Sequence, residues 1–99
     1  MKFRKKHIEI EAIQFKRRLN ESPDWYLDAV TNNIIYTHNQ GKFNNPLDKC
    51  YAIIKTSEGD MICNEDDWII KEPFDKDWRK VYPCKKEIFE KTYEIVENK

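Results

Sequence analysis

The chain has 99 residues, of which 39% are hydrophobic, 13% aromatic and 36% charged, and a chain of this length builds one core, so we expect a single domain over residues 1–99. Its 18 basic and 18 acidic side chains cancel, which is unusual for a protein whose main activity is binding nucleic acid. Only 2 glycines are present, so a glycine-rich phosphate loop is excluded.

The first expected element is a strand over residues 7–15. Apolar residues there alternate with Glu9 and Glu11, and the apolar phase then shifts by one position toward Phe15. Such a shift predicts a β-bulge, or a strand whose two halves are covered on opposite faces.

A short helix should follow, beginning near Ser22. Ser22 is able to cap the free amides of the first turn, Pro23 fits that turn, and Asp24 meets the positive end of the helix dipole. We expect the helix to end after two turns at residues 31–33. Its buried stripe should consist of Trp25, Ala29 and Val30.

The rest of the chain is typical of short strands joined by turns. We expect strands at 34–38, 51–56, 61–63, 68–71 and 80–84, and loops at 39–48 and 72–79. Gly59 lies in a tight turn, where a positive φ is least costly for glycine. A final helix should present one apolar face, made of Ile88, Phe89, Thr92 and Tyr93. These elements predict an α+β fold: a small, strongly curved antiparallel sheet or partial barrel with two short helices.

No pattern in the chain is typical of a catalytic or metal site, so we expect a protein that is not an enzyme and uses no cofactor. Cys50 and Cys63 fall in strand patterns and should be core residues, whereas Cys84 precedes a helix whose N-terminus could stabilise a thiolate. Asp66 and Asp67 are adjacent and point in opposite directions, which predicts a solvated turn rather than a carboxylate pair.

Charge is distributed unevenly along the chain. Residues 1–18 carry 7 basic and 2 acidic side chains, and residues 58–77 carry 2 basic and 8 acidic ones. The basic arm either contacts phosphates or faces the acidic segment, within the fold or across a homo-oligomer, and the zero net charge favours the second. The odd number of cysteines and the lack of an apolar run after the basic start favour a cytoplasmic location, and no stretch is long enough to span a membrane.

Several aromatic and basic side chains fall where the expected strands end or the loops begin. We predict that seven of them face a ligand: Arg17, Arg18, Tyr36, His38, Lys55, Trp78 and Arg79. Arginine and lysine would hold phosphates, and Tyr36 or Trp78 would stack on a base. The alternative is that Trp78 covers a sheet edge and the cations only aid solubility, while Trp25 and Trp68 are core residues.

A series of motifs follows in order along the chain: EIEAIQF at 9–15, PDW at 23–25, EGDM at 58–61, DWIIK at 67–71 and VYPCKKEIFEKTYE at 81–94. In this order they resemble a family of small uncharacterised phage and prophage accessory proteins. In that family a short, glycine-containing turn commonly follows the DWIIK motif, whereas residues 72–79 here are longer and lack glycine. The resemblance implies an origin in phage and no established catalytic residues.

From this resemblance and the absent catalytic set we expect a phage-encoded, non-enzymatic binding protein that counters bacterial immunity in the cytoplasm of the infected host. It would sequester a nucleotide-type immune signal or occlude a host defence protein. The alternative is a nucleic-acid-binding accessory factor that uses the basic N-terminal arm, and a third hypothesis is a virion-assembly component. Because one small domain rarely encloses a ligand, we expect a homo-oligomer.

Overall fold

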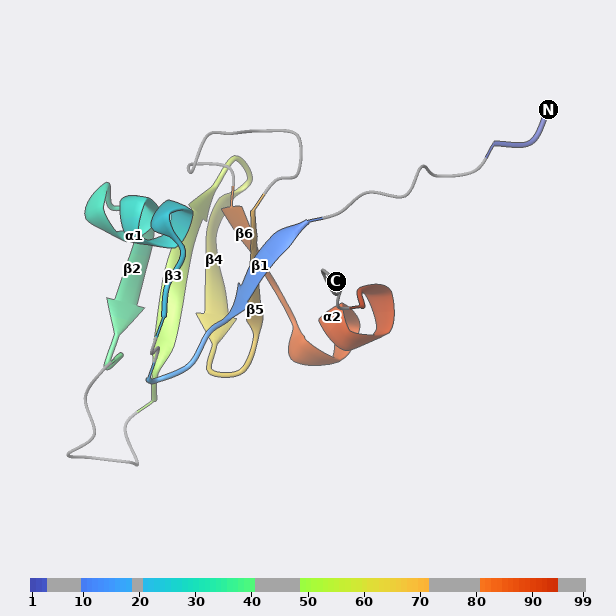
Figure 1. Ribbon diagram of the computed structural model, residues 1–99. Coiled ribbons are helices and arrows are strands. Elements are labelled where there is room, and N and C mark those ends of the chain that lie inside the picture. The colour runs from blue at the N-terminus through green and yellow to red at the C-terminus, as the bar shows by residue number, and fades with distance from the viewer. Residues whose placement is uncertain (4–9, 19–20, 41–48, 72–80, 95–99) are drawn as a thin grey trace.

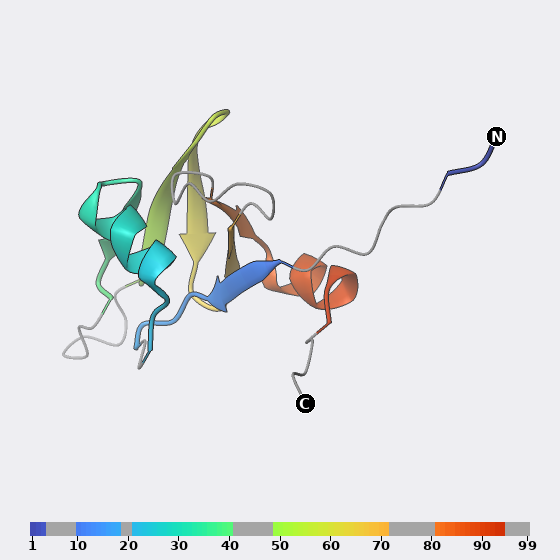
Figure 2. The ribbon, with the colours of Figure 1, turned by 45° about the horizontal axis from the view of Figure 1, so that its top comes forward.

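The computed structural model describes residues 1–3, 10–18, 21–40, 49–71 and 81–94. These residues form two three-stranded antiparallel sheets and two short helices, so the expected α+β class is confirmed (Figure 1). The sheets do not close on themselves, and the term partial barrel fits them only loosely. The helices lie at opposite ends of the molecule (Figure 2).

The order of the elements agrees closely with the sequence prediction. In chain order they are β1 (Glu11–Gln14), α1 (Asp24–Thr31), β2 (Ile35–His38), β3 (Tyr51–Thr56), β4 (Gly59–Asn64), β5 (Trp68–Lys71), β6 (Val81–Cys84) and α2 (Lys86–Thr92). Strand β3 has the predicted bounds, whereas β4 is longer than expected at both ends. Gly59 has a φ of 112°, as its turn requires. The loop at 72–79, and residues 41–48 of the other loop, lie outside the described residues.

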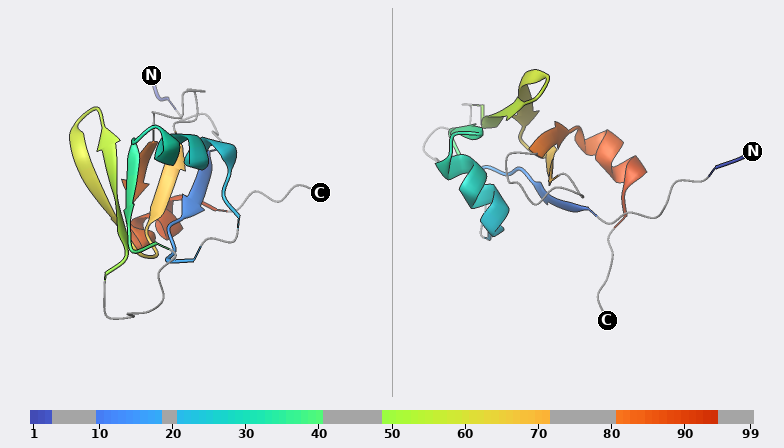
Figure 3. Two further views of the ribbon diagram at one scale, coloured as in Figure 1. Left: turned by 90° about the vertical axis from the view of Figure 1, so that its left-hand side faces the viewer. Right: turned by 90° about the horizontal axis from the view of Figure 1, so that it is seen from above.

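The two sheets have the strand orders β1-β5-β6 and β2-β3-β4. Strand β6 pairs with β5 and also lies against β3 and β4, so the sheets meet along this strand (Figure 3). The core lies between the sheets and α1, and its members are Phe15, Tyr26, Ala29, Ile35, Cys50, Ala52, Ile54, Cys63, Ile69 and Val81. The remaining face of the β2-β3-β4 sheet is directed away from this core.

Strand β1 is shorter than predicted within the described residues, and residues 7–9 of the expected strand lie outside them. The predicted bulge is absent from β1, because its four residues pair one to one with β5. Phe15 follows the strand and extends the pairing: its N–H donates to the Asp67 carbonyl, and its carbonyl accepts from the Asp66 N–H, both at 2.7 Å. Phe15 is therefore fixed through its backbone as well as its buried ring.

Helix α1 corrects two predictions. Ser22 does not cap it: the residue before the helix is Pro23, no side chain caps the helix, and the Pro23 carbonyl accepts the N–H of Tyr26 at 3.0 Å. The buried side chains are Tyr26 and Ala29, while Trp25 and Val30 only pack at the margin of the core. Tyr26 can be buried because its hydroxyl donates a hydrogen bond to Gln40 Oε1 at 3.1 Å.

Helix α2 is attached to the domain by a column of rings. The Trp68 and Phe89 rings stack with centroids 4.1 Å apart and planes 9° apart, and Tyr93 follows at 4.8 Å from Phe89. Trp68 itself is half-buried, whereas the sequence predicted a core residue. Ile88, predicted for the apolar face of this helix, is 58% exposed.

The turn between β4 and β5 also departs from the prediction. Asp67 is not solvated: it is 7% exposed, and its two carboxylate oxygens accept the backbone N–H groups of Asn64 at 3.2 Å and Lys86 at 3.1 Å. Lys86 is the first residue of α2, so Asp67 holds the start of this helix against the turn. Asp66 points elsewhere and forms an ion pair with Lys16.

Candidate functional site

The strongest candidate for a binding surface is the exposed side of the β2-β3-β4 sheet, which we call the outer face. In β3, Ala52 and Ile54 are buried in the core, so the alternating residues Tyr51, Ile53 and Lys55 point outward. The registers with β2 and β4 place the other members on the same side: Tyr36, His38, Asp60, Ile62 and Asn64. Helix α1 packs on the inner side, where Tyr26 and Ala29 join the core (Figure 3).

Three rings and one ammonium group are the main features of the outer face. His38 and Tyr51 are directly opposite each other in the register, and their rings stack with centroids 4.8 Å apart. Tyr36 is 44% exposed, and the Lys55 Nζ lies 5.1 Å from the centroid of its ring. These two are diagonal neighbours across the strands, a spacing that long side chains can bridge.

The outer face also carries apolar area and a negative charge. Ile53 lies opposite both Tyr36 and Ile62, and Ile62 is 58% exposed on the edge strand β4. Asp60 is the register partner of Lys55 on β4, so the outer face also carries a carboxylate. The surface therefore combines exposed rings, an aliphatic patch and one pair of opposite charges.

Three of the seven predicted ligand residues lie together on this face, namely Tyr36, His38 and Lys55. Arg17 lies instead beside the β4–β5 turn, where its Nε is 4.0 Å from Glu65 Oε1 and its side chain is 15% exposed. Arg18 follows it and is exposed. Trp78 and Arg79 lie outside the described residues.

Sequence reasoning missed Tyr51, Ile53 and Ile62 as members of this surface. The alternation in β3 indicates that Tyr51 and Ile53 share a face with Lys55. The sequence does not give the register between β2 and β3, because the segment that joins them is long. The stacking of His38 on Tyr51 depends on that register.

The cysteines do not form a nucleophilic site among the described residues. Burial, with a smaller contribution from Asp67, raises the pKa of the Cys63 thiol to about 12. Burial and the same carboxylate also raise the pKa of Cys84, a direction opposite to stabilisation of its thiolate. Burial raises the pKa of Cys50 as well. All three thiols are thus less ionised at neutral pH than a free cysteine.

We expect native protein at pH 8 to react slowly with a thiol reagent such as dithionitrobenzoate. Thiolate is the reactive form, and a raised pKa lowers its fraction at every pH below that value. Cys84, which is only half-buried, should react first, and Cys63 should stay unreacted until the protein unfolds. The measurement is the number of protein thiols modified with time, read from the nitrothiobenzoate released, with and without denaturant. A Cys84→Ser variant should lose the native phase; rapid labelling of Cys63 in folded protein would contradict the assignment.

Within the described ranges, no three His, Cys, Asp or Glu side chains are arranged so that they could hold a metal ion. Across the same residues, no helix is both long and apolar enough to cross a membrane. Comparison of the chain with family models, curated proteins and solved structures gave no match.

Proposed function

We propose that this protein is a non-enzymatic binding protein that sequesters a nucleotide-type ligand on its outer face. The supporting observation is the group of rings on one face of a single sheet, with Lys55 over Tyr36 and His38 stacked on Tyr51. The resemblance to phage proteins supports the further step that the ligand is an immune signal of the infected bacterium. Sequestration in the host cytoplasm would then lower the free concentration of that signal.

The rings supply the larger part of the binding free energy in this proposal. A base stacked on an aromatic side chain contributes about 1–3 kcal/mol, and a sheet surface holds its rings at a fixed spacing before the ligand arrives. Tyr36 presents an exposed ring, whereas His38 and Tyr51 already stack on each other. A first base would therefore stack on Tyr36, and a second would stack on the outer side of the His38–Tyr51 pair.

Lys55 supplies the positive charge for a phosphate. Its ammonium group is placed over Tyr36 in the free protein, and a base that stacks there displaces it toward the phosphate of the same ligand. Asp60, opposite Lys55, opposes this because it repels a phosphate. The outer face consequently suits ligands with few phosphates, such as a cyclic nucleotide, better than highly charged ones.

A second candidate is the occlusion of a host defence protein by the same face. Ile53 and the exposed Ile62 favour it, because apolar and aromatic side chains dominate the energetics of protein interfaces. The hypothesis of nucleic-acid binding depends on the basic arm, and residues 4–9 of that arm lie outside the described part of the chain. It predicts binding that weakens steeply with salt, whereas stacking on the outer face should be much less sensitive.

Native mass spectrometry tests the proposal directly. The protein would be purified from bacteria with an active nucleotide-based defence system, and its mass recorded under conditions that keep non-covalent complexes. A retained nucleotide supports sequestration, and the same spectrum gives the oligomeric state, for which we propose a homo-oligomer. The proposal would be overturned if the purified protein carried no added small-molecule mass and a panel of cyclic nucleotides caused no thermal shift.

Substitutions on the outer face should change affinity for a retained nucleotide in opposite directions. We expect Tyr36→Ala to weaken binding by roughly 5- to 150-fold, the equivalent of one lost stacking contact. Lys55→Gln should weaken it and Asp60→Asn should strengthen it, each by about two- to fivefold, because these are exposed charges. Isothermal titration calorimetry gives the constants. Tyr93→Ala is the matched control, since its ring lies just after α2 and away from the outer face.

A further inference from the structure

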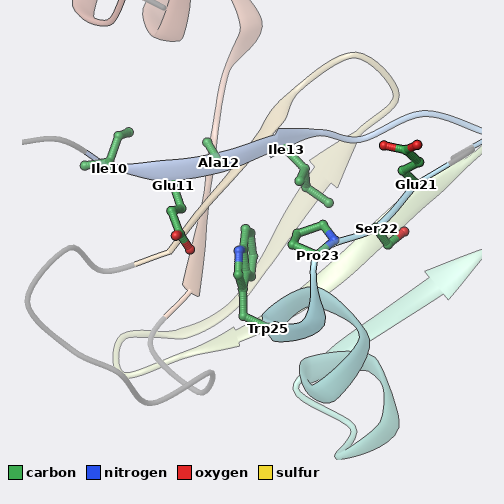
Figure 4. Close-up of a pocket in the computed structure, with 8 residues that line it drawn as sticks. All are labelled: Ile10, Glu11, Ala12, Ile13, Glu21, Ser22, Pro23 and Trp25. Atoms are coloured by element: carbon green, nitrogen blue, oxygen red, sulfur yellow. The ribbon is translucent and has the colours of Figure 1, made fainter. Parts of the chain in front are cut away.

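A pocket on another part of the molecule is not used by the proposed function. It lies between β1 and the start of α1, has a volume of about 590 Å³ and is open to solvent. The lining comes from two short stretches, residues 10–13 and residues 21–25, and consists of Ile10, Glu11, Ala12, Ile13, Glu21, Ser22, Pro23 and Trp25 (Figure 4). This volume is within the range of small-molecule sites in proteins.

The lining has an ordered chemical pattern. Glu11 and Glu21 lie at opposite ends, and Ile13, Pro23 and Trp25 lie between them (Figure 4). Along the pocket, a carboxylate is therefore followed by an apolar wall with an indole ring and then by a second carboxylate. An unbranched aliphatic chain with an ammonium group at each end has the complementary pattern. Its methylene groups would cover the apolar wall, and an indole ring attracts a nearby ammonium group by a cation–π interaction.

The charge balance around the pocket favours a cation. Glu11 and Glu21 are exposed and have no ion-pair partner among the described residues, and Asp24 in the first turn of α1 adds a third carboxylate nearby. The positive end of the α1 dipole, equivalent to about half a charge, opposes them. Lys71 also opposes them, because it is the register partner of Glu11 on β5. Among the described residues, three carboxylates against these two positive charges leave the pocket negative.

We propose that this pocket binds linear aliphatic diamines and polyamines. Glu11 and Glu21 would each pair with one terminal ammonium group, and Trp25 would cover the methylene chain. The ligand carries the opposite charge to a nucleotide, and the pocket is separate from the outer face. If the pocket binds no polyamine, the proposed function of the outer face is therefore unaffected. Lys71 acts as an internal competitor for Glu11 and limits the affinity.

The test is calorimetric titration of the full chain with 1,4-diaminobutane, 1,8-diaminooctane and spermidine at low salt. Saturable binding in which a diamine binds more tightly than butylamine, which has one ammonium group, is the expected result. Glu11→Gln and Glu21→Gln should each weaken it by about two- to fivefold, and Lys71→Gln should strengthen it by a similar factor, because all three charges are at least partly exposed. Glu58→Gln, an exposed carboxylate in the β3–β4 turn, is the matched control and should have no effect.

A second readout locates the ligand. In a proton–nitrogen correlation spectrum, the indole N–H of Trp25 should shift on titration while that of Trp68 stays in place. No saturable binding at millimolar concentration would overturn the proposal. So would equal binding of butylamine, or an equal loss of affinity in Glu58→Gln, because either result indicates non-specific attraction to surface charge.

Discussion

Replacing Phe15 with alanine is expected to lower the free energy of unfolding by about 3–5 kcal/mol, the usual range for truncating a buried phenylalanine. The ring is 0% exposed and lies in the core between the two sheets. Hydrogen bonds to the carbonyl of Asp67 and from the amide of Asp66 hold its backbone, so the chain cannot readily move to fill the cavity. Domains of this kind have total stabilities of about 5–15 kcal/mol, so the variant should lose between a fifth of its stability and nearly all of it.

Urea unfolding monitored by circular dichroism measures this loss. Phe3→Ala is the matched control, because Phe3 is 90% exposed and its removal should change stability by no more than about 0.5 kcal/mol. Phe15→Leu should recover part of the loss by refilling the cavity. If Phe15→Ala unfolded at the same urea concentration as the parent protein, the placement of this ring at the centre of the core would be wrong.

The fold was largely predictable because its strands are local patterns. In β3 the alternation of apolar residues, followed by a turn at Gly59, is sufficient to identify a hairpin. Helix α1 shows the limit of this reasoning. Trp25 and Tyr26 are adjacent, large and apolar, and helical periodicity alone does not decide which of them is buried. The decision depends on Gln40, which provides a partner for the Tyr26 hydroxyl and is 14 residues away.

The candidate site was predictable only in part, for a similar reason. Tyr36, His38 and Lys55 could be selected by residue type and by their positions on the expected strands. Their meeting on one face requires the register of β2 against β3, and a register slip of one residue would reverse every side chain. Arg17 was selected as a cation at a strand end, and the structure places it away from this face, beside Glu65.

The burial of Asp67 was the least predictable feature of the fold. In the sequence it is one of three consecutive acidic residues, a pattern that indicates a solvated turn. Its burial depends on backbone amides that need an acceptor, and one of them, the N–H of Lys86, is 19 residues away. A buried carboxylate is stable in this position because it accepts two N–H groups and lies 3.7 Å from the Lys85 ammonium group.

The same contacts make Asp67→Ala the second most damaging substitution that we expect. It leaves the amides of Asn64 and Lys86 without their acceptor, and bonds to a charged group contribute about 1.5–3 kcal/mol each. Water can reach the start of α2, which reduces the loss, so we expect a decrease of roughly 2–4 kcal/mol in the free energy of unfolding. Asp67→Asn should be intermediate, because its amide keeps one acceptor oxygen.

The control for this substitution is the neighbouring Asp66, whose ion pair with Lys16 is about half exposed. Asp66→Asn should cost no more than about 1 kcal/mol, and asparagine is chosen because the φ of this residue is 77°, a conformation that asparagine tolerates. Urea unfolding measures both variants. Trp68 fluorescence, recorded in a background where Trp25 and Trp78 are replaced by phenylalanine, adds a local readout. If Asp67 holds the start of α2, its loss should loosen the stack of Phe89 on Trp68 before the rest of the domain unfolds. Equal stabilities for Asp67→Ala and Asp66→Asn would show that the buried carboxylate does not fix this helix.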